Sequence, residues 1–169
     1  MLFLTRVYIL RFVTAKNDET EMGQLEKTIS LNFNHGYLID KANVTSKAGI
    51  YIVYVGKYHE EKDTVFLHKL IYIGEAKNVK NRLSKHEKWK KWKRYVSEGE
   101  ILIFSVAGVD SPDSERAECA LIYYCQPSTN DECKEEFSYD KTTIKSTGNC
   151  KFIKSEFTVE RTKKSKTKK

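Results

Sequence analysis

GIYIVYVG at residues 49–56 and YIGEAKNVKNRL at residues 72–83 are the two stretches that decide the fold. The first is a run of β-branched and aromatic residues between two glycines, which predicts a strand. A second apolar run at residues 65–73 predicts another strand, and we expect the two to pair in antiparallel fashion. The charged segment between them, residues 57–64, has the composition of an exposed hairpin loop.

The pattern becomes helical after residue 78. Apolar residues recur there at spacings of three and four as far as residue 96, which predicts one helix that stops near Gly99. Arg82 and His86 would then lie on one face, since they are four residues apart. Residues 101–106 predict a third strand. A second helix is expected from residue 111, with Pro112 in its first turn, to about residue 126.

Length and charge limit the organisation of the chain. Its 169 residues suffice for one domain with a hydrophobic core but not for two full-sized domains. We expect an N-terminal extension at 1–47 with a strand at 2–13, a core at 48–131, a C-terminal extension at 132–161 that adds a short strand to the sheet, and a basic tail at 162–169. Thirty Lys and Arg against 23 Asp and Glu give a net charge of +7, which suits a polyanionic partner. The tail can equally be a solvated, disordered segment.

The cysteines and the N-terminal segment bear on compartment. The four cysteines contain no Cys-x-x-Cys pair and have no histidine at zinc-finger spacing; they are Cys119, Cys125, Cys133 and Cys150. We therefore expect neither a zinc site nor a disulfide, and we interpret them as reduced thiols of a cytoplasmic protein. Residues 2–13 are apolar but interrupted by two arginines and too short to cross a bilayer, so we expect a soluble protein.

Several side chains of the core are of the types that phosphodiester hydrolysis needs. Tyrosine hydroxyls can handle a proton, an arginine can bind phosphate, a histidine can titrate near neutral pH and a carboxylate can hold a metal ion. The candidates are Tyr51, Tyr72, Arg82, His86 and Glu118. Each also has an ordinary explanation: strand packing for the tyrosines, a solvated surface position for the arginine and the histidine, and a salt bridge for the glutamate.

The order of these residues resembles the GIY-YIG nuclease family. Gly49-Ile50-Tyr51 and Tyr72-Ile73-Gly74 match the two tripeptides of the family, and Arg82 with His86 matches the helix that follows them. The later part of the motif is matched by Glu118, Pro127 and Asn130. The resemblance covers about residues 48–131. It implies an α+β fold, mixed α/β in composition, with a small antiparallel sheet flanked by helices.

The resemblance also implies roles for these residues. Tyr51 would activate a water molecule, directly or through His86, and Arg82 would stabilise charge on the phosphate. Tyr72 would hydrogen-bond to a phosphate oxygen or to the water, and Glu118 would hold Mg²⁺ or Mn²⁺. Asn130 would have a supporting role, structural or orienting.

One position departs from the family pattern. Many members carry a lysine just after the second tripeptide, where Glu75 stands here. Lysine assistance would therefore have to come from Lys77, Lys80 or Lys69, and we take Lys77 as a supporting residue.

The resemblance leads us to expect a metal-dependent DNA endonuclease, of restriction type or stand-alone. RNA stays open as a substrate, and a restriction enzyme would form a homodimer to cut both strands. The residues expected to contact nucleic acid are Lys80, Lys85, Lys90, Lys93 and Arg94. The alternative is a non-catalytic nucleic-acid-binding module, for which Trp89 and Trp92 among these lysines would supply stacking surfaces; the two tryptophans can equally cover the core.

Overall fold

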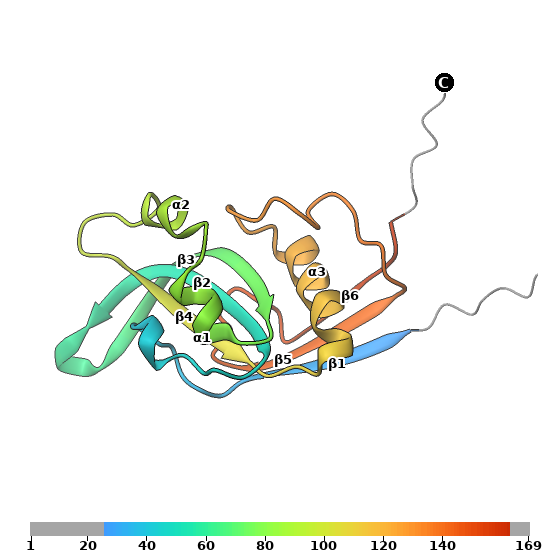
Figure 1. The fold of residues 1–169 in the computed structure, drawn as a ribbon, viewed down its shortest axis with the longest axis horizontal. Helices are drawn as coiled ribbons and strands as arrows, with labels where there is room; N and C mark the ends of the chain where they lie inside the picture. The colour runs from blue at the N-terminus through green and yellow to red at the C-terminus, as the bar shows by residue number, and fades with distance from the viewer. Residues whose placement is uncertain (1–25, 163–169) are drawn as a thin grey trace, which may run out of the picture.

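The computed structural model describes residues 26–162 and contains two three-stranded sheets with helices around them (Figure 1). The strand predicted at 2–13 lies outside the described residues, as does the tail predicted at 162–169 except for Thr162. The α+β class expected from the sequence is confirmed at this level. None of the described helices is long and apolar enough to cross a membrane.

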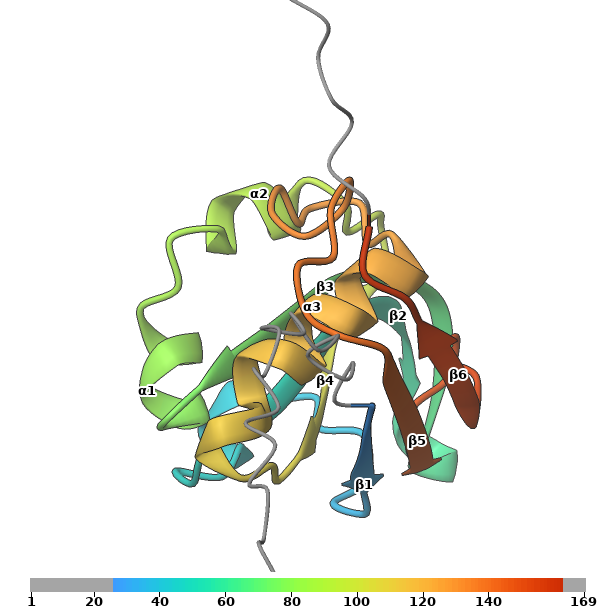
Figure 2. The same cartoon turned by 90° about the vertical axis from the view of Figure 1, so that its right-hand side faces the viewer.

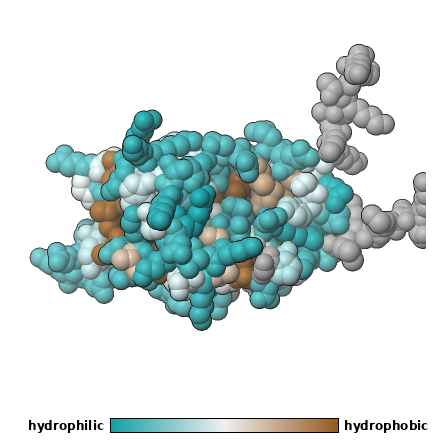
Figure 3. All heavy atoms as spheres, viewed as in Figure 1, coloured by the Kyte–Doolittle hydropathy of each residue, from teal (hydrophilic) through white to brown (hydrophobic). Residues whose placement is uncertain are grey.

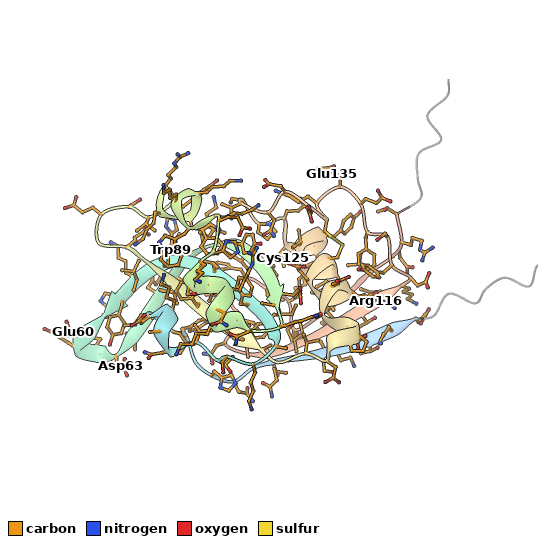
Figure 4. The ribbon with its side chains drawn as sticks, in the orientation of Figure 1. Glu60, Asp63, Trp89, Arg116, Cys125 and Glu135 are labelled. Atoms are coloured by element: carbon orange, nitrogen blue, oxygen red, sulfur yellow. A yellow bond between two sulfur atoms is a disulfide. The ribbon has the colours of Figure 1, made fainter. Side chains whose placement is uncertain are left out.

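The first sheet is antiparallel and has β2 (Gly49–His59) at its centre, between β3 (Thr64–Ala76) and β4 (Ile101–Ala107). Residues 49–56 of β2 are buried on both faces, as their unbroken apolar character requires. The predicted pairing of the first two strands and the third strand are confirmed. The hairpin loop predicted at 57–64 is wrong, because the strands continue to the pair His59 and Thr64. Only a turn around η2 (Glu60–Lys62) joins them, and Glu60 and Asp63 project from this tip (Figure 4).

The second sheet joins strands from opposite ends of the described chain. β1 (Lys27–Phe33) runs parallel to β5 (Thr142–Gly148), which pairs in antiparallel fashion with β6 (Glu156–Val159). We predicted neither β1 nor β5, and we expected the C-terminal strand to join the first sheet. The alternation of Ile29, Leu31 and Phe33 with polar residues is itself a strand pattern, but it does not indicate that the partner strand lies more than 100 residues away.

Helix α3 (Ser114–Cys125) lies between the two sheets (Figure 2). Its buried Ala117, Ala120 and Leu121 belong to the same hydrophobic cluster as Ile73 of β3 and Ile144 of β5. The α-helix begins three residues later than predicted, because residues 111–113 form a short 3-10 helix, η3 (Ser111–Asp113). Its end at Cys125 agrees with the prediction, and the following residue has the left-handed conformation typical of a helix end.

The single helix predicted from residue 78 to Gly99 is wrong. The chain forms α1 (Val79–Ser84), then a turn, then the short α2 (Trp89–Lys93). The break lets Leu83 and Trp92 both pack on the face of the first sheet that α3 does not cover. His86 lies in the turn, so it does not share a helix face with Arg82.

The expectation of four reduced cysteines is also wrong. Cys119 of α3 and Cys133 form a disulfide across 14 residues, while Cys125 and Cys150 are free thiols. The spacing of the cysteines in the sequence does not indicate this pair. The two meet because the loop after α3 folds back along the helix.

Polar residues dominate the face of the protein shown in Figure 3. Among the described residues, the large apolar side chains that are exposed are Ile39, Phe66 and Phe152. Ile39 precedes another short 3-10 helix, η1 (Lys41–Asn43).

Candidate active site

A cleft of about 830 Å³ is lined by residues of β2, β3, α1, α3 and the loop that follows α3. This volume is within the about 300–1,000 Å³ typical of ligand sites. Tyr51, Tyr72, Arg82 and Glu118 all line it, so the side chains that the sequence predicted to lie together do so. They come from four different elements or turns, separated by up to 67 residues in the sequence.

The glycines of the two tripeptides allow close approach around Tyr51. Tyr51 pairs with Gly74 across the two strands, and a β-carbon at Gly74 would clash with the Tyr51 ring and hydroxyl. A β-carbon at Gly49 would clash with the carbonyl oxygen of Ala107 on the neighbouring strand. Each glycine is therefore required because another group occupies the space of a side chain.

Tyr51, Tyr72 and His86 form a buried aromatic group at the back of the cleft. The ring centroids of the two tyrosines lie 6.0 Å apart, and the Tyr51 hydroxyl lies 3.0 Å from His86 Nε2. The side chain of His86 is fully buried and packs on Trp92 at a centroid distance of 4.2 Å. Burial, followed by the charge of Arg82, lowers the pKa of His86 to about 4. Burial raises the pKa of both tyrosines, so at neutral pH all three groups are uncharged.

Arg82 has its guanidinium engaged by a carboxylate. Its Nη1 and Nη2 donate to Glu87 Oε2 and Oε1 at 2.8 and 2.7 Å, a bidentate pair. The Glu87 side chain is 58% exposed, so this ion pair faces solvent at the cleft. Sequence reasoning did not single out Glu87, since its contact with Arg82 depends on the turn between the two helices.

Glu118 is half-buried and keeps one oxygen free. Its Oε1 accepts a hydrogen bond of 3.1 Å from the Glu75 peptide N–H, while Oε2 has no hydrogen-bond partner among residues 26–162. Burial raises the pKa of Glu118 to about 7, and the negative charges of Glu75, Glu132 and Glu115 add to this rise. A divalent cation would offset both effects.

These surroundings suit Mg²⁺ better than a metal that needs an all-protein cage. No group of three His, Cys, Asp or Glu side chains in the described part of the chain is arranged to hold a metal ion. Mg²⁺ commonly uses one or two carboxylates and keeps several water ligands. Glu118 is the carboxylate that could serve as such a ligand, because it lines the cleft and has one oxygen free.

Asn130 and Thr129 pair with the outer edge of β3. Asn130 accepts the Ile73 N–H at 3.0 Å and donates to the Ile73 carbonyl at 2.8 Å. The Thr129 N–H donates to the Ile71 carbonyl at 2.9 Å, and Trp92 Nε1 donates to the Thr129 hydroxyl at 3.1 Å. These contacts fix one wall of the cleft against the sheet that carries Tyr72.

Only two of the predicted basic residues line the cleft. Lys77 and Lys85 line it and are exposed. The remaining predicted contacts are exposed on α1 or around α2; they are Lys80, Lys90, Lys93 and Arg94. Lys88 also lines the cleft, where it donates to the Thr129 carbonyl at 3.0 Å and pairs with Asp131 at 2.6 Å.

The arrangement can bind a phosphodiester through a guanidinium, tyrosine hydroxyls and a carboxylate-held cation. These are the groups required to stabilise the charge that develops in phosphoryl transfer. Comparison of the chain with protein-family models, curated proteins and solved structures finds no match.

Proposed function

We propose that this protein is a metal-dependent endonuclease that hydrolyses DNA phosphodiester bonds by chemistry of the GIY-YIG type. One observation carries the proposal: two tyrosines, an arginine and a desolvated glutamate from distant parts of the chain line one cleft. A desolvated carboxylate in a cleft, with its pKa raised to about 7, is typical of functional sites.

In this proposal each side chain acts on one part of the substrate. Arg82 would exchange the Glu87 carboxylate for the scissile phosphate, because the two anions match the guanidinium fork in the same way. Tyr72 would donate to a phosphate oxygen or to the attacking water. Glu118 would hold Mg²⁺ or Mn²⁺, which supplies Lewis-acid stabilisation of the phosphate and lowers the pKa of bound water.

Lysines around the cleft would bind the phosphates that flank the cleaved bond. Lys77 and Lys85 are at its mouth, and Lys80, Lys90, Lys93 and Arg94 extend the basic surface across α1 and α2. Binding through phosphates would weaken steeply with salt. Cutting both strands of a duplex at one site would require a second copy of the chain.

The alternative, a non-catalytic nucleic-acid-binding module, loses one of the two tryptophans that favoured it. Trp92 is fully buried and its indole N–H is engaged by Thr129. Trp92 therefore offers no face to a base. Trp89 is half-buried; it stacks on Phe104 at a centroid distance of 6.2 Å, and Lys41 Nζ lies 4.3 Å from its ring centroid.

The test is cleavage of supercoiled plasmid, linear duplex DNA and duplex RNA with Mg²⁺, with Mn²⁺ and with EDTA. We expect DNA cleavage that requires the cation and is lost in Glu118→Gln, with Glu115→Gln as the matched control. Glu115 is exposed in the first turn of the same helix, so its substitution should leave cleavage intact. Salt-sensitive DNA binding without cleavage under any of these conditions would favour the binding module, and cleavage of RNA alone would change the substrate.

A further inference from the structure

The two ring nitrogens of His86 have different partners. Nε2 lies 3.0 Å from the Tyr51 hydroxyl, and Nδ1 lies 3.1 Å from the peptide nitrogen of Lys88, whose N–H points at it. A peptide N–H can only donate a hydrogen bond. His86 Nδ1 therefore accepts, which requires that it carry no proton.

A neutral imidazole carries its one proton on the nitrogen that does not accept. We infer that the Lys88 peptide holds His86 in the Nε2–H tautomer, so that His86 donates a hydrogen bond to Tyr51 and cannot take its proton. His86 is then a positioning residue for Tyr51. The tautomer follows from the two hydrogen bonds alone. Only its consequence for the cleavage reaction rests on the proposed function.

The surroundings of the ring exclude the doubly protonated form. A proton on Nδ1 would face the proton of the Lys88 N–H. Arg82 and, to a smaller extent, the Lys88 ammonium add positive charge nearby, and Trp92 covers the ring. Glu87 is the nearby acid, but its Oε2 is 3.8 Å from Nδ1 and already accepts from Arg82. Tyr51 and Tyr72, the other titratable groups at the ring, are uncharged at neutral pH.

The family resemblance implies that Tyr51 takes a proton from the attacking water either directly or with His86 as the final acceptor. The tautomer excludes His86 as the acceptor. A route from the water through Tyr51 to His86 would need a lone pair on Nε2, and that position holds a proton. Tyr51 can take the proton of the water only while it passes its own hydroxyl proton to an oxygen on the cleft side, such as a non-bridging phosphate oxygen. The bond from the water oxygen to phosphorus then forms while the phosphorus–oxygen bond to the leaving group breaks. The water gives one proton to Tyr51, and the proton that Tyr51 passes to the phosphate oxygen can go on to the leaving oxygen, which departs as a hydroxyl.

The direct test is long-range ¹H–¹⁵N NMR of protein labelled at histidine, which distinguishes protonated from unprotonated ring nitrogens. The chain has four histidines, and the His86 signals are assigned by their absence in His86→Gln. We expect a protonated Nε2 and an unprotonated Nδ1 from pH 5 to pH 8. A protonated Nδ1 would overturn the inference, whether or not the protein cleaves DNA.

Two substitutions at one position test the cause of the tautomer. Lys88→Pro removes the peptide N–H, and the φ of −83° at Lys88 is close to the value that proline requires. Lys88→Ala keeps the N–H but loses the side-chain contacts with Thr129 and Asp131, so it is the matched control. We expect the Nδ1–H form to appear in Lys88→Pro alone. Equal spectra for the two variants would show that the peptide does not select the tautomer.

Cleavage rates distinguish a His86 that donates a hydrogen bond to Tyr51 from a His86 that acts as a base. Glutamine can present an N–H in place of Nε2–H, so we expect His86→Gln to retain cleavage within about tenfold, with an unchanged pH profile, while His86→Ala loses about 100-fold. Equal losses of cleavage rate in the two variants would contradict the donor role, provided that thermal unfolding shows both variants to be folded. Wild-type protein that does not cleave DNA would refute the proposed function and leave the NMR result to decide the tautomer.

Discussion

Glu118→Gln is predicted to make the metal-free protein more stable at alkaline pH. The pKa of Glu118 is raised in the folded protein from 4.5 to about 7, chiefly by burial. Folding therefore favours the protonated carboxyl. Its contribution to stability is complete below pH 4.5 and is lost as the pH rises through 7. Glutamine stays neutral at every pH and can still accept the Glu75 N–H.

The size of the effect follows from the pKa. At about 1.4 kcal/mol per pH unit, the rise corresponds to about 3 kcal/mol. Because Glu118 lines the open cleft and keeps some contact with water, we expect about 2 kcal/mol. The wild-type protein should lose this amount, relative to Glu118→Gln, between pH 5 and pH 8.

The assay is denaturant unfolding in EDTA, followed by the fluorescence of the buried Trp92. Glu98→Gln is the control, since this exposed glutamate is not among the charges that act on Glu118 and should leave the pH dependence of wild type unchanged. Saturating Mg²⁺ should remove most of the alkaline loss in wild type and have little effect on Glu118→Gln. Identical pH dependence in wild type and Glu118→Gln would refute the argument that Glu118 is desolvated and that a cation relieves it.

Three further results are expected. Asn130→Ala leaves the buried N–H and carbonyl of Ile73 unpaired and should lower the free energy of unfolding by about 3 kcal/mol, whereas a loss below about 1 kcal/mol would mean that water replaces the amide. Reducing the Cys119–Cys133 disulfide should cost about 3 kcal/mol for a loop of this length, and an unchanged denaturation midpoint with dithiothreitol would contradict this. Glu87→Gln should tighten binding of DNA in EDTA by up to about fivefold in fluorescence anisotropy, because an exposed ion pair is worth at most about 1 kcal/mol; unchanged affinity would mean that Glu87 does not compete with phosphate.

The sequence predicted the parts of the site that depend on local pattern. The unbroken apolar runs and the glycines set the first two strands, and their pairing brings Tyr51 opposite Gly74. Helix α3 was also predictable, from its start signals and from the proline after it. The convergence of the tyrosines with Arg82 and Glu118 was expected from the resemblance to the GIY-YIG family, because local patterns do not bring together residues on four separate elements.

The remaining features depend on contacts between residues that are distant in the sequence. β1 and β5 pair across more than 100 residues, and the disulfide forms because the loop after α3 returns to Cys119. The helical pattern after residue 78 continues through the turn in the sequence, but packing of Trp92 on the sheet and the hydrogen bond between Lys88 and His86 favour a break there. That break places His86 against Tyr51. Its role therefore follows from tertiary structure, because the energy of burying two aromatic faces exceeds the small local preference for one continuous helix.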